Sequence, residues 1–297
     1  MAPTWLCIDD GSSDDGSSMN LTFELAAGPI AAISNDDRLV ADRPLPSDPE
    51  LVLLVPGFTG SKEDFLPLLR PLAGAGYRAI AFDQRGQYQS GWADHSDGYR
   101  LDALAAEVCE LADQLNPAGI ALHLVGHSFG GLVSRAAVLA QPGQFTDLVL
   151  MGSGPAAIQG DRRFRIEQGA AVLAESGMHA LWEVMKAGSQ ADPRYVRLAP
   201  VLDAFLRERF LTTDTAGLKA MGNILLSEPD RCTELAAQAL PILVLHGVDD
   251  DSWPPPVQAA MARALSASYT VIESAAHSPA VENPPATAAA LIEFWQH

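Results

Sequence analysis

Basic residues are scarce in this sequence. The 297 residues contain 19 Lys and Arg against 37 Asp and Glu, which gives a formal net charge of −18, and only three of the basic residues are lysines. A surface this negative repels nucleic-acid phosphates and anionic lipid headgroups. The composition therefore argues against nucleic acids and membrane surfaces, and we expect neither as a partner.

Long apolar runs and cysteines are also lacking. Runs such as Leu51–Val55 and Ile242–Leu245 have the length of strands, far below the ~20 apolar residues of a membrane-spanning helix. Cys7, Cys109 and Cys232 lie far apart and form no Cys-x-x-Cys pair, so neither a disulfide framework nor a zinc site is indicated. The first residues lack the basic and apolar segments of a secretory signal. We expect a cytoplasmic protein.

Apolar residues, in contrast, are plentiful, at 48% of the chain against 19% charged residues. From residue 51 onward, apolar runs without polar alternation are interleaved with segments of helical periodicity. This pattern is typical of a parallel sheet covered on both faces, so we predict an α/β fold with a mostly parallel central sheet flanked by helices. The predicted strands are Leu51–Val55, Tyr77–Phe82, Ile120–Val125, Leu148–Met151, Pro241–Leu245 and Tyr269–Ile272. The predicted helices are Lys62–Gly74 (broken by Pro67 and Pro71), Leu101–Leu115, Phe129–Ala140 and Thr287–Trp295.

Two features precede this alternation. Residues 1–20 are rich in Asp, Ser and Gly, have little to bury, and are predicted to be a flexible acidic segment. Leu21–Leu25 and Ile30–Ile33 are short strand-like runs joined by Ala-Ala-Gly-Pro, which predicts a β-hairpin at an edge of the sheet.

Residues 155–239 interrupt the alternation and contain no convincing strand. Residues 156–239 carry ten basic and eleven acidic residues and are nearly neutral, whereas the remaining chain carries nine basic and 26 acidic residues. We predict a helical cap, or lid, inserted into an α/β core formed by residues 21–154 and 240–297. The helices predicted within the cap are Glu167–Glu175, His179–Met185, Pro200–Phe210 and Glu234–Leu240.

The sequence Gly126-His-Ser128-Phe-Gly130 contains a Gly-x-Ser-x-Gly motif. A buried strand is predicted before it and a helix after it, which is the context in which this motif forms a nucleophile elbow. Glycine is expected at positions 126 and 130 because side chains on either side of so sharp a turn would collide. The turn lifts the hydroxyl of Ser128 to the N-terminus of the following helix. We therefore predict that Ser128 is a nucleophile.

A serine hydroxyl needs a base to accept its proton, and the base needs a carboxylate to orient it. Asp249, Asp250 and Asp251 follow one late strand, and His277 follows the last strand. Both places are carboxyl ends of parallel strands, where α/β sheets carry their sites. The chain order Ser, Asp, His is that of a Ser-His-Asp triad on an α/β sheet.

These residues together resemble the α/β-hydrolase superfamily, in its serine esterase or lipase form with a helical cap. The resemblance implies that Asp250 is the triad acid and that the backbone N–H groups of Phe58 and Phe129 form an oxyanion hole. It implies no cofactor and no metal. Two positions depart from the common pattern: Pro56 replaces a usual His, and Tyr88 replaces a usual Gly. The resemblance rests on Pro56-Gly57-Phe58, Asp83-Gln84-Arg85-Gly86, Gly126–Gly130, Gly247-Val-Asp-Asp250 with Pro254, and Ala-His277-Ser-Pro.

The activity that this resemblance implies is hydrolysis of carboxylic esters, with a small to medium, mainly neutral or apolar molecule as substrate. A thioesterase, an amidase, a carbon–carbon bond hydrolase or a cofactor-free perhydrolase could use the same triad. A ligand-binding sensor that lost turnover is an alternative of another class, although a binder would need no intact triad. Serine at the elbow argues against epoxide hydrolases and haloalkane dehalogenases, which use Asp there. The sequence indicates no oligomeric state.

Several other residues could take part in the site or serve only the structure. His123 is expected to pack in the core, His127 to orient the elbow, and His246 to support the site from behind. The cluster Arg162-Arg163-Arg165 is either a solvated helix face or a recognition site for an anionic substrate. Aromatic and Met residues of the cap, such as Trp182 and Met178, suit either an apolar acyl pocket or ordinary helix packing.

Overall fold

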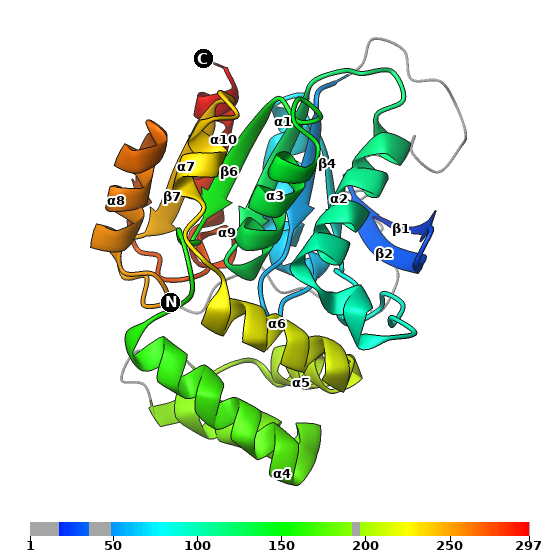
Figure 1. The fold of residues 1–297 in the computed structure, drawn as a ribbon, viewed down its shortest axis with the longest axis vertical. Coiled ribbons are helices and arrows are strands. Elements are labelled where there is room, and N and C mark those ends of the chain that lie inside the picture. The colour runs from blue at the N-terminus through cyan, green and yellow to red at the C-terminus, as the bar shows by residue number, and fades with distance from the viewer. Residues whose placement is uncertain (1–17, 36–48, 192–196, 297) are drawn as a thin grey trace.

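The computed structural model describes residues 18–35, 49–191 and 197–296. Its centre is an eight-stranded sheet with the order β1-β2-β4-β3-β5-β6-β7-β8 (Figure 1). The strands are β1 (Met19–Leu25), β2 (Gly28–Ser34), β3 (Leu51–Val55), β4 (Arg78–Phe82), β5 (Leu122–His127), β6 (Asp147–Met151), β7 (Ile242–Gly247) and β8 (Ser268–Ile272). The helices are α1 (Leu66–Gly74), α2 (Leu101–Leu115), α3 (Phe129–Ala140), α4 (Gly160–Ala191), α5 (Pro200–Thr212), α6 (Thr215–Ser227), α7 (Cys232–Ala236), α8 (Pro255–Leu265), α9 (Pro279–Glu282) and α10 (Pro284–Trp295), with short 3-10 helices η2 (Lys62–Phe65) and η3 (Ser96–Tyr99).

The sheet is parallel from β3 to β8, and the antiparallel hairpin β1–β2 extends it beyond β4. Every residue of β3, β4, β5, β6 and β7 is buried, which explains why apolar residues predominate in these strands without polar alternation. One apolar layer packs α2, α3 and α8 against the sheet, and a second packs α1 and α10 against the other face. The predicted α/β fold and edge hairpin are confirmed.

Helix α1 differs from the prediction, because Pro71 lies inside it without ending it. Pro67 sits at the start of the helix, where no backbone donor is needed. The N–H that Pro71 lacks would have donated to the carbonyl of Pro67, so one helical hydrogen bond is lost. Burial of Leu68, Leu69 and Leu72 offsets that loss.

Between β6 and β7 the described residues form α4 to α7, which we call the helical insertion. The sequence predicts two helices, Glu167–Glu175 and His179–Met185, and α4 does consist of two helical segments, separated at Gly177, whose φ of 79° and ψ of −175° are not helical. Helix α6 is absent from the prediction, although it begins with an Asp214 cap and buries Leu218, Met221 and Leu225 at helical spacing. Its two glycines weaken the helical signal of the sequence. Figure 1 shows α4, α5 and α6 together at one end of the molecule, below the sheet.

Most of the predicted acidic segment, residues 1–17, lies outside the described residues. Its end is different from the prediction, because Met19 and Asn20 already belong to β1, where they pair with β2. Within the described ranges, no helix combines the length and the apolar character needed to cross a membrane.

Candidate active site

The serine of the Gly-x-Ser-x-Gly motif lies in a sharp turn between β5 and α3. Ser128 has φ 55° and ψ −118°, in the left-handed half of φ that residues with side chains rarely adopt. A Cβ on Gly126 would lie 2.5 Å from the carbonyl oxygen of Gly130, and a Cβ on Gly130 would lie 2.3 Å from the carbonyl oxygen of Val55. No side chain fits at either position, which is the steric reason that the motif suggests.

Three side chains meet at the carboxyl ends of β5, β7 and β8. Nε2 of His277 lies 2.9 Å from Oγ of Ser128, and Nδ1 of His277 lies 3.0 Å from Oδ1 of Asp250. Both distances are those of hydrogen bonds. The imidazole therefore connects the hydroxyl to the carboxylate, in the order that the sequence predicts.

Asp250, rather than its neighbours, reaches His277. Asp250 is 3% exposed, whereas Asp249 is exposed and Asp251 faces two arginines of α4 at 3.5 and 3.8 Å. Burial opposes ionisation of Asp250, but the hydrogen bond and positive charge of His277 outweigh it and hold the pKa of the carboxyl below its ordinary value. The group stays ionised at neutral pH.

Two donors complete the surroundings of this carboxylate. The N–H of Ser252 donates to Oδ1 at 2.9 Å, and Nε2 of Gln258 donates to Oδ2 at 2.9 Å. Gln258 is fully buried on α8 and also donates to the carbonyl of Trp253. The sequence analysis missed Gln258, because nothing in the sequence pairs a helix glutamine with an acid eight residues earlier.

His127 supports the imidazole from the other side. Its Nε2 donates to the backbone carbonyl of His277 at 2.8 Å, so this ring carries its proton on Nε2. Burial, helped by the positive charge of His277, lowers the pKa of His127 to about 4. The ring is therefore neutral at physiological pH and fixes the position of the His277 backbone, which is close to the orienting role expected for it.

The two amides predicted for the oxyanion hole lie at either side of Ser128. Phe129 is the first residue of α3, and Phe58 follows β3 in the segment Pro56-Gly57-Phe58. A Cβ on Gly57 would lie 3.1 Å from Cβ of Ser128, so this segment passes directly against the serine. Neither the N–H of Phe58 nor that of Phe129 hydrogen-bonds to the part of the chain that the structure describes. Both donors are available to an oxyanion.

The loop after β4 holds this segment in place. Nε2 of Gln84 donates to the carbonyl of Pro56 at 2.8 Å, and Nε2 of Gln87 donates to the carbonyl of Gly57 at 2.8 Å. Asp83 accepts from both the backbone N–H and Nζ of Lys62, at 2.7 and 2.8 Å. Burial raises the pKa of Asp83 to about 6 in spite of that lysine.

Tyr88, which departs from the common family pattern, has a place in this loop. Its backbone adopts φ 36°, the left-handed region in which the usual glycine is unstrained. Its ring lies 4.9 Å from Nζ of Lys62 and meets the ring of Phe205 on α5 edge to face at 5.7 Å. The bulk of Tyr88 therefore joins the loop to the helical insertion.

The remaining candidates lie elsewhere. His123 is buried as expected, but its two ring nitrogens face Asp147 and Glu50 at 2.5 and 3.2 Å, and these hydrogen bonds raise its pKa although burial opposes them. His246 is buried between the carbonyl of Gly247 and the hydroxyl of Tyr269. Neither ring is hydrogen-bonded to Ser128, Asp250 or His277.

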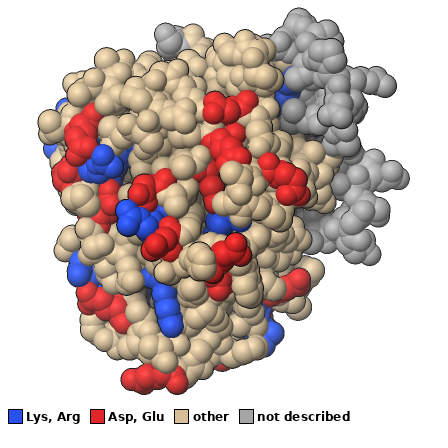
Figure 2. All heavy atoms as spheres, turned by 45° about the vertical axis from the view of Figure 1, so that its right-hand side comes forward, with Lys and Arg blue, Asp and Glu red and all other residues tan. Residues whose placement is uncertain are grey.

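Two of the three clustered arginines lie beside the loop that follows β7. Arg162 and Arg165 lie 3.8 and 3.5 Å from Asp251, while Arg163 pairs with Glu167 on its own helix. On the face seen in Figure 2, acidic side chains are scattered among neutral ones, and most basic side chains lie beside acidic ones. Among the residues described, no group of three or more His, Cys, Asp or Glu is arranged to hold a metal ion.

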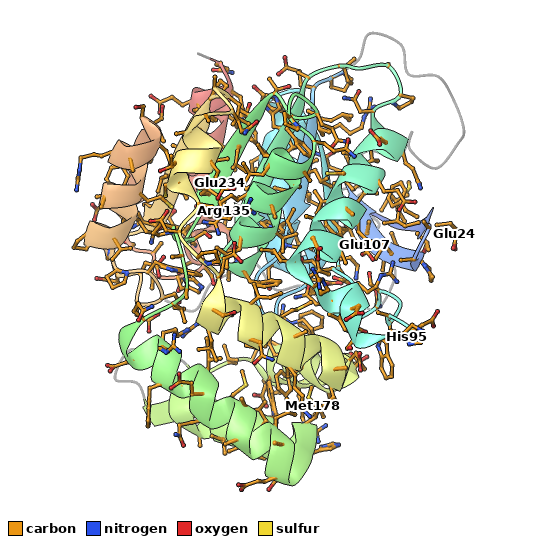
Figure 3. The ribbon with its side chains drawn as sticks, viewed as in Figure 1. Glu24, His95, Glu107, Arg135, Met178 and Glu234 are labelled. Atoms are coloured by element: carbon orange, nitrogen blue, oxygen red, sulfur yellow. The ribbon has the colours of Figure 1, made fainter. Side chains whose placement is uncertain are left out.

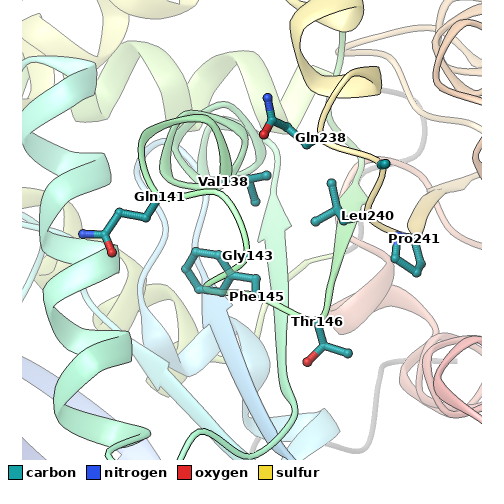
Figure 4. A pocket seen from close by; sticks show the side chains of 9 residues that line it. Val138, Gln141, Gly143, Phe145, Thr146, Gln238, Leu240 and Pro241 are labelled. Atoms are coloured by element: carbon teal, nitrogen blue, oxygen red, sulfur yellow. The ribbon is translucent and has the colours of Figure 1, made fainter.

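A cavity of about 260 Å³ lies away from these residues (Figure 4). Val138 and Phe145 line it together with Thr146, which precedes β6, and Pro241, which precedes β7. It therefore opens at the amino ends of the strands, whereas Ser128 lies at their carboxyl ends. This cavity is not part of the candidate site.

Comparison with known proteins finds hydrolases among the relatives of this chain. The putative carbamate hydrolase RutD of Variovorax paradoxus is 40% identical over 108 residues, which cover 36% of this chain and only 40% of that relative. The protein of the same name from Pantoea ananatis is 29% identical over 212 residues, 69% of this chain and 72% of that relative.

Solved structures share the fold at low identity. A carboxylesterase structure from Nitrososphaera gargenis has a TM-score of 0.75 at 20% identity, covering 93% of this chain and 98% of that one. The enol-lactonase of Burkholderia xenovorans has a TM-score of 0.75 at 20% identity, covering 93% and 100%. The model of the alpha/beta hydrolase family matches residues 52–290. The chain therefore belongs to the alpha/beta hydrolase family and is an α/β-hydrolase.

Proposed function

We propose that this α/β-hydrolase is a serine hydrolase that cleaves carboxylic esters through an acyl-enzyme. The observation that carries the proposal is the hydrogen-bonded series from Ser128 through His277 to Asp250, at 2.9 and 3.0 Å. An imidazole activates a serine by accepting its proton on Nε2, and a carboxylate at Nδ1 holds the ring in the tautomer that can do so. The series supplies both groups.

In the proposed reaction, Oγ of Ser128 attacks the ester carbonyl while Nε2 of His277 accepts the hydroxyl proton. The tetrahedral intermediate collapses, the alcohol leaves with that proton, and the acyl group remains on Ser128. Water then attacks the acyl carbon and gives a proton to His277. The acid departs as Ser128 regains this proton, and Asp250 stays ionised throughout.

Each tetrahedral intermediate carries a negative oxygen that needs donors. The N–H groups of Phe58 and Phe129 are the proposed donors, because both are free of other partners in the described structure and flank Ser128. The N-terminus of α3 adds a favourable dipole at the same place.

The helical insertion is proposed to act as a cap over this site, and its side chains support a small to medium, mainly neutral or apolar substrate. Phe58 packs against an apolar cluster of the insertion that includes Leu173, Leu181, Phe210 and Leu218, and the half-buried Met178, labelled in Figure 3, packs against it too. An apolar pocket gains about 0.8 kcal/mol per buried methylene. The acidic surplus outside the insertion disfavours anionic substrates.

Carbamate hydrolysis is a second candidate. The observation in its favour is the similarity to the two relatives named putative carbamate hydrolase, one of them aligned over 72% of its length. The carbonyl of a carbamate can be attacked by the same nucleophile and held by the same donors, so the triad does not separate the two candidates.

The test uses purified protein with p-nitrophenyl esters and matched aryl carbamates of graded length. We expect a burst of p-nitrophenol with the esters, covalent labelling of Ser128 by a phosphonate located by mass spectrometry, and loss of both in Ser128→Ala. A label on another residue would disprove the assignment of the nucleophile. Faster turnover of carbamates than of esters with the same leaving group would favour the second candidate.

A further inference from the structure

Gln87 is not one of the triad residues, yet it is completely buried against the segment that carries Phe58. Its exposed fraction is 0%, and its Nε2 donates to the carbonyl of Gly57 at 2.8 Å. A second neighbour of the same nitrogen is Sδ of Met221 on α6, at 3.9 Å. Its Oε1 accepts from the backbone N–H of Gln84 at 3.2 Å, so both ends of this buried amide are hydrogen-bonded, as its burial requires. The bond from Nε2 to Gly57 is the one that reaches the segment carrying Phe58.

The carbonyl that Gln87 holds belongs to the same peptide group as the N–H of Phe58. In a planar trans peptide these two bonds point in opposite directions, and no peptide of the described residues is cis. A carbonyl of Gly57 turned toward Gln87 therefore turns the N–H of Phe58 away from Gln87. Ser128 lies against the same segment, within 3.1 Å of a Cβ built on Gly57.

The local turn alone is a weak restraint on this peptide. The N–H of Gly60 also donates to the carbonyl of Gly57, at 3.1 Å, which closes a four-residue turn. Within that turn Thr59 has φ 59°, a conformation that a β-branched residue rarely adopts. The turn is therefore strained, and the bond from Gln87 comes from outside it, from the loop after β4.

We propose that Gln87 is a positioning residue of the oxyanion hole, which keeps the N–H of Phe58 aimed at the developing negative oxygen. The inference rests on the proposed serine-hydrolase function. Without the donor at position 87, only the bond from Gly60, within the strained turn, opposes rotation of the peptide between Gly57 and Phe58. Rotation removes one oxyanion donor and brings a carbonyl oxygen toward the place where negative charge develops.

Gln84 provides a matched control from the same loop. Like Gln87 it is buried, with 2% of its surface exposed, and its Nε2 donates to a carbonyl of the same segment at 2.8 Å. That carbonyl belongs to Pro56, so the N–H in the same peptide is that of Gly57, which the mechanism does not use. The two glutamines anchor the same segment one peptide apart.

The experiment compares Gln87→Met, Gln84→Met and Gln87→Glu with the wild type. Methionine keeps the length of the side chain and removes the donor. We expect Gln87→Met to lower kcat on a p-nitrophenyl ester by about 10- to 100-fold, less than the ~10²–10³ for a lost oxyanion donor, because the Gly60 bond remains. Gln87→Glu should lose more, because its carboxylate repels the carbonyl of Gly57. Gln84→Met should lose less than about threefold, and KM should change little in all three.

The second readout is inhibition by a trifluoromethyl ketone, which forms a tetrahedral adduct whose oxyanion occupies the hole. Its inhibition constant should rise in Gln87→Met by about the factor by which kcat falls, since both report the transition state. Thermal unfolding shows whether each variant is folded, and if Gln87→Met does not fold, Gln87→Glu carries the comparison.

Wild-type kcat in Gln87→Met, an equal loss in Gln84→Met, or unchanged inhibition would each overturn the inference. A wild type that shows neither ester turnover nor labelling at Ser128 would instead overturn the proposed function, and this inference with it. The two failures are therefore distinguishable.

Discussion

Replacing Asp250 by asparagine keeps the shape of the side chain but conflicts with its hydrogen bonds. Oδ1 accepts from Nδ1 of His277 at 3.0 Å and from the N–H of Ser252 at 2.9 Å, while Oδ2 accepts from Nε2 of Gln258 at 2.9 Å. An asparagine must point its NH2 group at one of these sets of donors. We therefore expect Asp250→Asn to be severely impaired although it stays folded.

The magnitude follows from the tautomer of His277. With the NH2 group at the Oδ1 position, Nδ1 of His277 becomes the acceptor, the ring proton moves to Nε2, and Ser128 has no base. The corresponding change in a Ser-His-Asp protease costs ~10⁴-fold in kcat. In the alternative orientation the NH2 group of the asparagine faces only the Nε2 of Gln258, and His277 keeps its acceptor. We therefore expect kcat to fall by ~10³- to ~10⁴-fold here, which is about 4 to 5.5 kcal/mol in transition-state stabilisation.

The assay is kcat on a p-nitrophenyl ester, with thermal unfolding as the check on folding. Asp249→Asn is the control, because Asp249 is exposed and its side chain has no hydrogen bond to His277. It should stay within about threefold of the wild type, the size expected for a surface change away from the reacting groups. Equal damage in Asp249→Asn, or more than a tenth of wild-type activity in Asp250→Asn, would refute the reasoning.

Three other predictions concern stability and specificity. The native state keeps His127 neutral down to a pKa of about 4, while the unfolded chain protonates it near its ordinary 6.5, so acid favours unfolding and about 3 kcal/mol of stability is lost between these pH values. Between pH 7 and pH 4.5 the free energy of unfolding in urea should fall less in His127→Asn than in the wild type. An equal fall in both proteins would contradict this prediction. Gly130→Ala should lower the free energy of unfolding in urea by about 1–3 kcal/mol, since its Cβ would lie 2.3 Å from the carbonyl of Val55; an unchanged midpoint would show that the turn can relax. For neutral esters, kcat/KM should rise with acyl length by up to about 0.8 kcal/mol per methylene and then fall once the pocket is full; a flat profile would rule out an apolar pocket.

The strands, and the three residues of the proposed triad that the structure brings together, could be predicted from the sequence because their signals are local. β3 is an unbroken apolar run and β5 is mostly apolar, which is the pattern that strands buried on both faces require. The elbow is a short motif set by sterics, and His277 is the first histidine after the last strand. The choice of Asp250 among three adjacent aspartates needed the family resemblance, because a turn can present any of them.

The groups that support the site were out of reach, because their partners are distant in sequence. Gln87 contacts Gly57 across 30 residues, and His127 contacts the carbonyl of His277 across 150. Each bond forms because the loops that follow the parallel strands meet at the same edge of the sheet. Periodicity and turn chemistry describe neighbours along the chain, and they hold no information on which buried amide meets which carbonyl.

The arginine cluster shows how the structure can narrow an alternative left open by sequence. Arg162 is partly buried beside Asp251, with 34% of its side chain exposed, and burial lowers its pKa, so it does not lie on a fully solvated helix face. Its pairing with Asp251, at 3.8 Å, and that of Arg165, at 3.5 Å, are long and partly exposed, a type of pair worth under about 1 kcal/mol.

Asp251 therefore balances the charge of these arginines without holding them firmly. In Asp251→Asn two guanidinium groups lose their nearest acid, next to the loop that carries Asp250. We expect this variant to turn over neutral esters at the wild-type rate and to gain about threefold to tenfold in kcat/KM for matched esters with a carboxylate, since each 1.36 kcal/mol is tenfold. The gain should shrink at high salt, where exposed charges are screened. Equal rates for both ester classes in wild type and variant would mean that the arginines do not interact with the substrate. The apolar lining of the pocket alone would then select the substrate.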